Sequence, residues 1–139
     1  MKTVLKIIFL IFIFSNPLVG KNLYLQEGID LFKKKKFNEA KFKFEKDIVF
    51  NPKSELSYLY LSKIFKNLNK KNLQEQNLNA VILLNPKNEE AILNLAKLKL
   101  ENSDYAKSKE LNERLNLLCN KFCDQSKKLK FEIENLSKK

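Results

Sequence analysis

The chain has 139 residues, a formal net charge of +11 and no histidine. With no imidazole base and no glycine-rich phosphate loop, the sequence gives little support for catalysis, and we expect a protein that is not an enzyme and needs no cofactor. Arg114 is the only arginine among 27 basic residues. Because phosphate recognition favours the planar guanidinium group over the lysine ammonium, we expect no nucleic-acid partner.

The first residues are typical of an export signal. Lys2 and Lys6 accompany the apolar run Ile7–Phe14, and the small residue Gly20 follows. A run this short does not cross a hydrocarbon layer of roughly 30 Å as a helix. We therefore predict a signal peptide over residues 1–20 of a bacterial protein that is exported, either to the periplasm or to another part of the cell envelope. The alternatives are a retained membrane anchor and a buried N-terminal helix.

From residue 21 onward the chain repeats with a period of 34 residues. The tripeptide Asn51-Pro52-Lys53 recurs as Asn85-Pro86-Lys87, and the columns align without a gap. Since proline does not continue a helix, each tripeptide marks the turn from one helical hairpin to the next. The stretch has few glycines and prolines otherwise, so the sequence predicts an all-α fold of stacked helical hairpins.

Each predicted first helix carries a large and a small residue four positions apart. Residues at i and i+4 share one helix face, and the small residue lets a neighbouring helix approach closely. In the three copies these pairs are Tyr24 with Gly28, Tyr58 with Ser62, and Ile92 with Ala96. The second helices are predicted to begin near Phe37 in the first copy and Tyr105 in the third.

With these residues the chain resembles the tetratricopeptide repeat (TPR) family. The best match runs from Tyr24 through Gly28, Phe37 and Ala40 to Pro52, whereas the third copy has Asn120 where the family has proline. The resemblance implies three TPR-like helical hairpins in a short right-handed superhelix, followed by a C-terminal capping helix that covers the last repeat. The hairpins would span residues 21–54, 55–88 and 89–122, and the capping helix residues 123–139.

Four polar residues depart from the family pattern, which is apolar or small at their positions. They are Glu27, Asp47, Gln74 and Lys99. We interpret them as tolerated substitutions at half-exposed sites. The alternative is a local contact with a partner.

In this family the first helices of successive repeats line a concave groove that binds extended or helical segments of other proteins. The resemblance therefore implies a non-catalytic adaptor or scaffold that binds a protein or peptide in the cell envelope. The groove would be lined by Leu25, Ile29, Phe32, Leu59, Tyr60, Lys63, Lys66, Leu93, Asn94 and Lys97. An apolar floor with lysines toward one end suits an amphipathic segment with some acidic residues. Alternatively, part of this stripe packs against the C-terminal helix or a second copy.

One version of the fold binds the C-terminal carboxylate of chaperones with lysine, asparagine and arginine. The corresponding positions here are Leu25, Ile29, Tyr60, Glu90 and Asn94. Because Glu90 would repel a carboxylate, we do not expect that ligand.

Two rival functions remain open at this point. One is a self-associating or membrane-anchored structural protein of the envelope, suggested by apolar residues at Leu93, Leu98 and Leu100. The other is a peripheral protein that binds anionic lipid through its lysines. The run of lysines at 33–36 lies between two predicted helices, and we interpret it as a solvated loop tip.

Cys119 and Cys123 are the only cysteines. At i and i+4 of one regular helix, their Cβ atoms would stand about 5–6 Å apart, farther than the roughly 3.5–4.5 Å of a disulfide. A disulfide therefore needs a turn between the two residues, which Asn120 could supply. The alternative is a pair of small apolar residues packed under the last helix. Two thiolates without histidine do not complete a zinc site, so no metal is expected.

Overall fold

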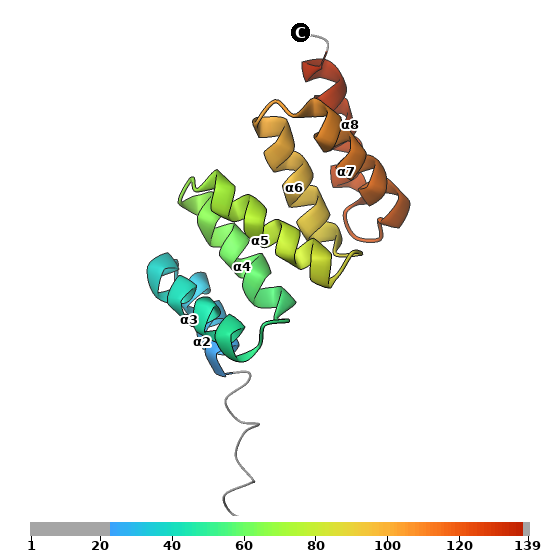
Figure 1. Cartoon of the computed structure of the whole chain (residues 1–139). Helices are drawn as coiled ribbons and strands as arrows, with labels where there is room; N and C mark the ends of the chain where they lie inside the picture. Colours follow the sequence, from blue (N-terminus) through green and yellow to red (C-terminus); the bar gives the residue numbers. More distant parts are fainter. Residues whose placement is uncertain (1–22, 138–139) are drawn as a thin grey trace, which may run out of the picture. The chain divides into compact units, whose positions relative to one another are not determined.

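The structure is a computed structural model that describes residues 23–137, and the predicted signal peptide lies outside these residues. Within them the chain forms seven α-helices and no strand (Figure 1), which confirms the predicted all-α fold. The helices are α2 (Leu23–Lys33), α3 (Phe37–Phe50), α4 (Glu55–Asn67), α5 (Lys71–Leu84), α6 (Glu89–Glu101), α7 (Tyr105–Leu118) and α8 (Cys123–Leu136). None of these helices has the length and hydrophobicity needed to span a bilayer.

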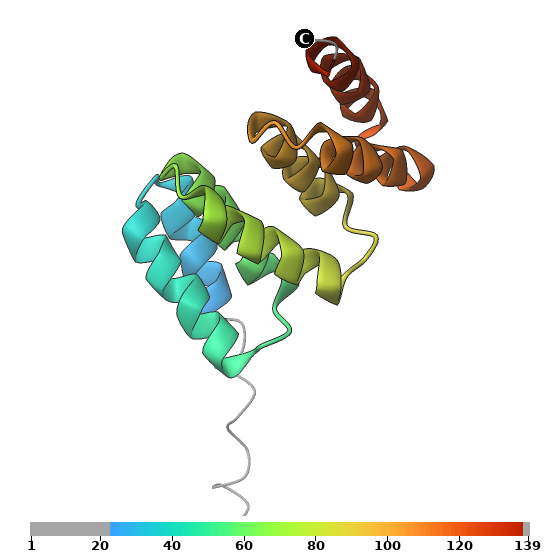
Figure 2. The ribbon, with the colours of Figure 1, turned by 45° about the horizontal axis from the view of Figure 1, so that its top comes forward.

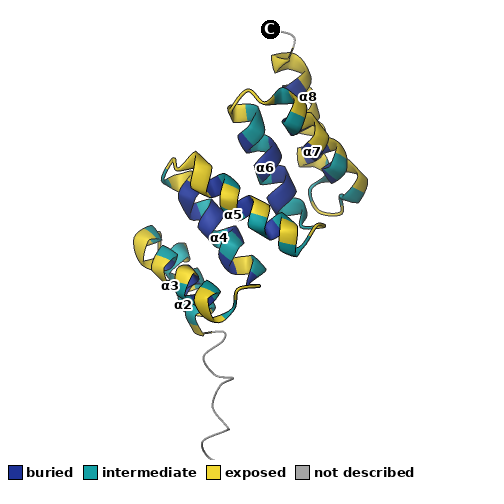
Figure 3. Ribbon diagram, in the orientation of Figure 1, coloured by how far each residue is buried: buried dark blue, intermediate teal, exposed yellow. Residues whose placement is uncertain are grey.

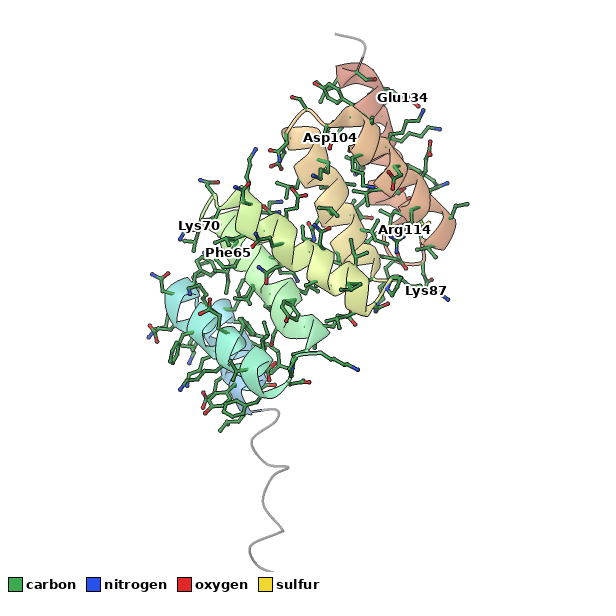
Figure 4. The ribbon with its side chains drawn as sticks, viewed as in Figure 1. Phe65, Lys70, Lys87, Asp104, Arg114 and Glu134 are labelled. Atoms are coloured by element: carbon green, nitrogen blue, oxygen red, sulfur yellow. A yellow bond between two sulfur atoms is a disulfide. The ribbon has the colours of Figure 1, made fainter. Side chains whose placement is uncertain are left out.

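The turn inside each hairpin repeats in its backbone geometry. Lys35, Asn69 and Ser103 lie 34 residues apart and all adopt a left-handed conformation, with φ of 58°, 53° and 61°. The next residue donates its N–H to a carbonyl five positions back, as from Lys70 to Phe65 at 2.8 Å. Both residues are labelled in Figure 4. This bond closes a C-terminal helix cap of the Schellman type. The sequence period thus corresponds to a repeated structural unit.

The turns between hairpins follow the two proline motifs. The helices α3 and α5 end at Phe50 and Leu84, directly before the asparagine of each motif. The Asn51 N–H still donates to the Asp47 carbonyl at 2.7 Å, and the proline that follows prevents further helix. After the second motif, the Asn88 side chain accepts a hydrogen bond from the Ala91 N–H at 2.8 Å and so caps the start of α6.

The structure divides into two compact units, with the boundary between Ser57 and Tyr58, inside α4. In the first unit α2 packs beside α3 (Figure 2). Gly28 of α2 faces the ring of Phe44, and a Cβ atom built at Gly28 would lie only 2.7 Å from that ring. The glycine of the large–small pattern therefore permits the close approach that the pattern predicts.

The second unit contains the main hydrophobic core. Its central helix is α6, which packs on α5 on one side and on α7 and α8 on the other. Figure 3 shows α6 buried along most of its length. The last helix, α8, contributes Leu129 and Ile133 to the same core, while its outer side is exposed. A helix that covers the end of a repeat array in this way keeps a polar outer face.

Candidate partner-binding surface

The ten predicted groove residues lie on the first helices of three hairpins. They are Leu25, Ile29 and Phe32 on α2; Leu59, Tyr60, Lys63 and Lys66 on α4; and Leu93, Asn94 and Lys97 on α6. Since α2 belongs to the first unit and the other residues to the second, the two sets are described separately.

In the second unit an ion pair joins the two first helices. The Lys63 Nζ atom of α4 lies 2.7 Å from Glu90 Oε1 of α6. The same ammonium group lies 5.0 Å from the centroid of the Tyr60 ring, a cation–π distance. Tyr60, Asn94 and the two charged residues are partly exposed, so this part of the chain presents an aromatic ring beside a charged pair.

Leu59 and Leu93 are each only 4% exposed and belong to the hydrophobic core of the second unit. Their side chains therefore lie beneath the surface and not on it. The sequence assigned them to the groove by their position in the repeat, and a period does not distinguish a residue that faces a groove from one beneath it. The accessible side chains of this set are therefore Tyr60, Lys63 and Lys66 on α4 with Asn94 and Lys97 on α6.

In the first unit, Leu25, Ile29 and Phe32 are partly buried along α2. The ring centroids of Phe32 and Phe37 lie 5.5 Å apart, and Phe37 is the first residue of α3. This contact fixes one end of the apolar stripe on α2. Lysines 33–36 beyond it are exposed.

Two of the four polar departures from the family pattern form ion pairs inside the protein. The carboxylate of Glu27 on α2 pairs with Lys43 of α3 at 2.5 Å. Lys99 of α6 pairs with Glu75 of α5 at 2.7 Å. Both pairs connect neighbouring helices, so these residues have a structural role that does not require a partner.

Asp47 is fully buried rather than half-exposed, which corrects the interpretation from sequence for this position. The Ser57 hydroxyl donates to Asp47 Oδ2 at 2.6 Å, and the Ser54 hydroxyl donates to Ser57 at 3.1 Å. This buried chain of hydrogen bonds ties α3 to the first turn of α4. Gln74 is also buried, in α5.

A turn separates the two cysteines, because α7 ends at Leu118 and α8 begins at Cys123. The sulfur atoms of Cys119 and Cys123 are bonded, and the Cα atoms stand 5.2 Å apart. Among residues 23–137, no cluster of three or more histidine, cysteine or acidic side chains is arranged to hold a metal ion.

The carboxylate of Glu89, at the start of α6, binds the backbone of this cysteine turn. It accepts hydrogen bonds from the N–H groups of Asn120, Lys121 and Phe122 at 2.9, 3.0 and 3.1 Å. These bonds, the one from Asn120 foremost, lower the pKa of the Glu89 carboxyl against a smaller opposing effect of desolvation. Sequence reasoning missed this role, because Glu89 and the turn are about 30 positions apart and carry no local signal.

A small cavity of about 310 Å³ lies between α7 and α8. It is lined by Lys109, Asn112, Glu113, Asn116, Ser126, Lys127, Lys130, Ile133, Glu134 and Ser137 (Glu134 is labelled in Figure 4). At its base the Asn112 side chain donates to the Ser126 carbonyl at 3.0 Å, and the Ser126 hydroxyl donates back to Asn112 Oδ1 at 3.0 Å. These two hydrogen bonds of Asn112 thus connect α8 to α7.

No protein-family model matches the chain, and no curated protein matches it. Several solved structures do match the chain. The TPR2B domain of yeast Sti1, solved as a complex with pHsp70, has a TM-score of 0.77 at 15% identity, covering 84% of this chain and 97% of that domain. The first TPR of Spaghetti (RPAP3), bound to an HSP90 peptide, has a TM-score of 0.75 at 18% identity, covering 84% and 93%.

A bacterial protein gives a similar result. The type III secretion chaperone SycD of Yersinia enterocolitica, in complex with a peptide of the translocator YopD, has a TM-score of 0.73 at 16% identity, covering 84% of this chain and 92% of SycD. At such identities the likeness concerns the fold and not the ligand. The chain has the all-helical hairpin fold of TPR domains.

Proposed function

We propose that this protein is a non-catalytic adaptor of the cell envelope that binds a peptide or helix of another protein on the first helices of its repeats. The observation that carries the proposal is the α4–α6 surface, where Tyr60, Lys63 and Glu90 meet. Support also comes from the similar structures of Sti1, solved as a complex with pHsp70, and of RPAP3 and SycD, each solved with a bound peptide.

The chemistry of the α4–α6 surface favours an amphipathic ligand. The Tyr60 ring offers an apolar contact with a polar edge, and such residues often dominate binding energy at interfaces. Lys63 is shared between Glu90 and the ring, so an acidic side chain of a ligand would compete with Glu90 for the same ammonium group. The exposed Lys66 adds positive charge. Since Leu25, Ile29 and Tyr60 stand at positions where the carboxylate-binding version of the fold has polar groups, we propose an internal segment with acidic residues rather than a free C-terminal carboxylate.

The envelope location rests on the sequence alone. Lys2, Lys6 and the apolar run Ile7–Phe14 have the composition of an export signal. Cell fractionation of a C-terminally tagged copy tests this part separately. Recovery in the cytosol would refute the location without affecting the proposed binding surface.

The binding surface is tested by cross-linking in the native cells, affinity capture of the tagged protein and mass spectrometry. The test variant is Tyr60→Ala with Lys97→Glu, because both side chains are partly exposed and their replacement leaves the core intact. The matched control, Leu117→Ala with Lys109→Glu, makes the same kinds of change on α7, where both residues are exposed. An aspartate at Leu59 is unsuitable, because a charge in the buried core would unfold the unit.

We expect one dominant envelope protein to be captured by the wild type and the control and lost with the test variant. Equal capture by a folded test variant would show that the α4–α6 surface is not the binding site. Partner binding by the apolar stripe on α2 (Leu25, Ile29 and Phe32) is a separate prediction. It is tested by the same capture experiment with the variant Ile29→Asp.

The three leucines that suggested self-association are not exposed on an apolar surface. Leu93 and Leu98 are buried, and Leu100 packs partly buried against the same core, so none of them forms an open apolar surface. We therefore do not propose a self-associating scaffold.

A further inference from the structure

The first unit has a continuous exposed face that the adaptor function does not use. Four large apolar residues on it are half or more exposed: Leu23 at 52%, Phe42 at 53%, Val49 at 74% and Phe50 at 61%. Phe42, Lys46, Val49 and Phe50 follow one another at helical spacing and share one side of α3. We call these four residues of α3, with Leu23 and Tyr24 of α2, the aromatic face.

The aromatic face lies at the start of the part of the chain that the structure describes. The rings of Tyr24 and Phe50 stack with a centroid distance of 5.6 Å, which joins the first turn of α2 to the last turn of α3. Leu23 is the first residue of α2 and follows the N-terminal segment that contains the apolar run Ile7–Phe14. In the sequence, Leu23 of the aromatic face lies nine positions after Phe14, the last residue of the run.

Lysine side chains lie among these rings. The Lys46 ammonium group is 4.7 Å from the centroid of Phe42 and 5.4 Å from that of Tyr24. Lys43 is 5.7 Å from Tyr24 and also pairs with Glu27. In this arrangement the apolar part of the lysine covers the rings while its charged end reaches their border.

Acidic groups near the face are already paired. Glu39 lies one turn before Phe42, and its carboxylate pairs with Lys36 at 3.2 Å. Glu45 pairs with Lys41 at 2.8 Å. The face itself contains apolar residues and Lys46 but no acid, so its charge is complementary to an anionic surface.

We propose that the aromatic face docks on the surface of a membrane that contains anionic lipid. The proposal rests on the envelope location proposed above, with the N-terminal run kept as an anchor, which is the alternative to a signal peptide that is removed. Helices that lie in a membrane interface combine large apolar residues with lysine. The rings would insert among the headgroups and Lys46 would contact lipid phosphate.

The absence of tryptophan from the chain allows a direct test. The full chain is reconstituted in vesicles of phosphatidylcholine with phosphatidylglycerol, as the variant Phe42→Trp or the control variant Leu117→Trp. Leu117 is 87% exposed on α7 and lies in the second unit. Bromine atoms on the lipid acyl chains quench a tryptophan that reaches the interface.

We expect brominated lipid to reduce the emission of Phe42→Trp by about twofold, since an aromatic residue of an interfacial helix lies at the boundary of the acyl chains. Emission of Leu117→Trp should not change. Adding Lys46→Glu to the first variant, or using vesicles of phosphatidylcholine alone, should reduce the quenching, because a lysine near an anionic surface contributes about fivefold in lipid affinity.

Three results would overturn the proposal. The first is no quenching of Phe42→Trp in anionic vesicles. The second is equal quenching of both variants, which would show that the vesicle does not select this face. The third is a blue-shifted emission that bromine does not quench, which would show that protein, either a second copy or another segment of the chain, covers the face. None of these results affects the capture experiment on α4 and α6.

Discussion

The two units of the molecule bury their helices to very different extents. In the second unit α6 has neighbours on both sides and buries six of its side chains, from Ala91 to Leu98. In the first unit α3 buries only Ala40, Phe44 and Asp47, although its sequence is also rich in large apolar residues. Apolar content alone therefore does not predict burial. The number of helices packed on an element decides which of its apolar residues become core and which remain available to other molecules.

The largest expected effect on stability distinguishes a leucine in the core from a leucine that remains exposed. Leu98 of α6 is 1% exposed, and Leu83 of α5 is 83% exposed. Leu98→Ala should lower the free energy of unfolding by about 3 kcal/mol, because it removes buried methyl groups and leaves a cavity. Leu83→Ala should change it by less than about 0.5 kcal/mol. Urea unfolding followed by far-ultraviolet circular dichroism measures both. Similar effects of the two substitutions would contradict the assignment of the core.

The second prediction concerns packing within the first unit. Gly28→Ala places a Cβ atom 2.7 Å from the Phe44 ring, which must then move. We expect a destabilisation of about 2 kcal/mol from this overpacking. Hydrogen exchange should show lower protection in α2 and α3 and unchanged protection in α6. Adding Phe44→Leu should restore part of the loss. If Gly28→Ala is neutral, the close contact between the two helices is not a constraint on the fold.

The third prediction is a pH dependence in the second unit. The folded state lowers the pKa of Glu89, so its hydrogen bonds contribute stability above the pKa of the unfolded chain. This contribution is lost as the pH falls through the lower, folded-state pKa. Glu89→Gln should therefore lower the melting temperature at neutral pH, and the difference from the wild type should shrink in acid. Glu90→Gln is a suitable comparison, since Glu90 pairs with Lys63 and not with the cysteine turn. A constant difference across the pH range would refute the proposed role of the carboxylate.

The smallest expected effect is a gain in stability at a loop. Lys35 adopts a left-handed conformation, which costs a non-glycine residue roughly 1–2 kcal/mol. Lys35→Gly should relieve part of this cost and stabilise the first unit by up to about 1 kcal/mol, despite the greater flexibility of glycine when unfolded. Lys34→Gly serves as the control, because Lys34 has no positive φ, and it should not stabilise. Thermal unfolding of the two variants gives the comparison.

The parts of the fold that the sequence predicted depend on local signals. The repeat of Asn51-Pro52-Lys53, the Gly28 position and the helix starts at Phe37 and Tyr105 are all readable from neighbouring residues. The Glu89 contact with the cysteine turn is not, because it joins residues distant along the chain. The burial of individual side chains is likewise not readable from neighbouring residues.

The candidate site was predicted less completely than the fold. The repeat register assigned Leu59 and Leu93 to the groove together with Tyr60 and Lys63. Only contacts between helices show that the two leucines lie in the core and that Lys63 pairs with Glu90. A periodic sequence therefore indicates which helices form a surface, while the side chains exposed on it follow from tertiary packing.

The most direct test of the proposed adaptor function is site-specific photo-crosslinking in the native cells. A photoreactive phenylalanine analogue replaces Tyr60 on α4 in one variant and Leu117 on α7 in another, and both positions tolerate a large side chain because they are not buried. The proposal predicts a discrete adduct with one partner protein from position 60 and none from position 117. An adduct that forms from position 117 and not from position 60 would show that the partner binds elsewhere on the molecule.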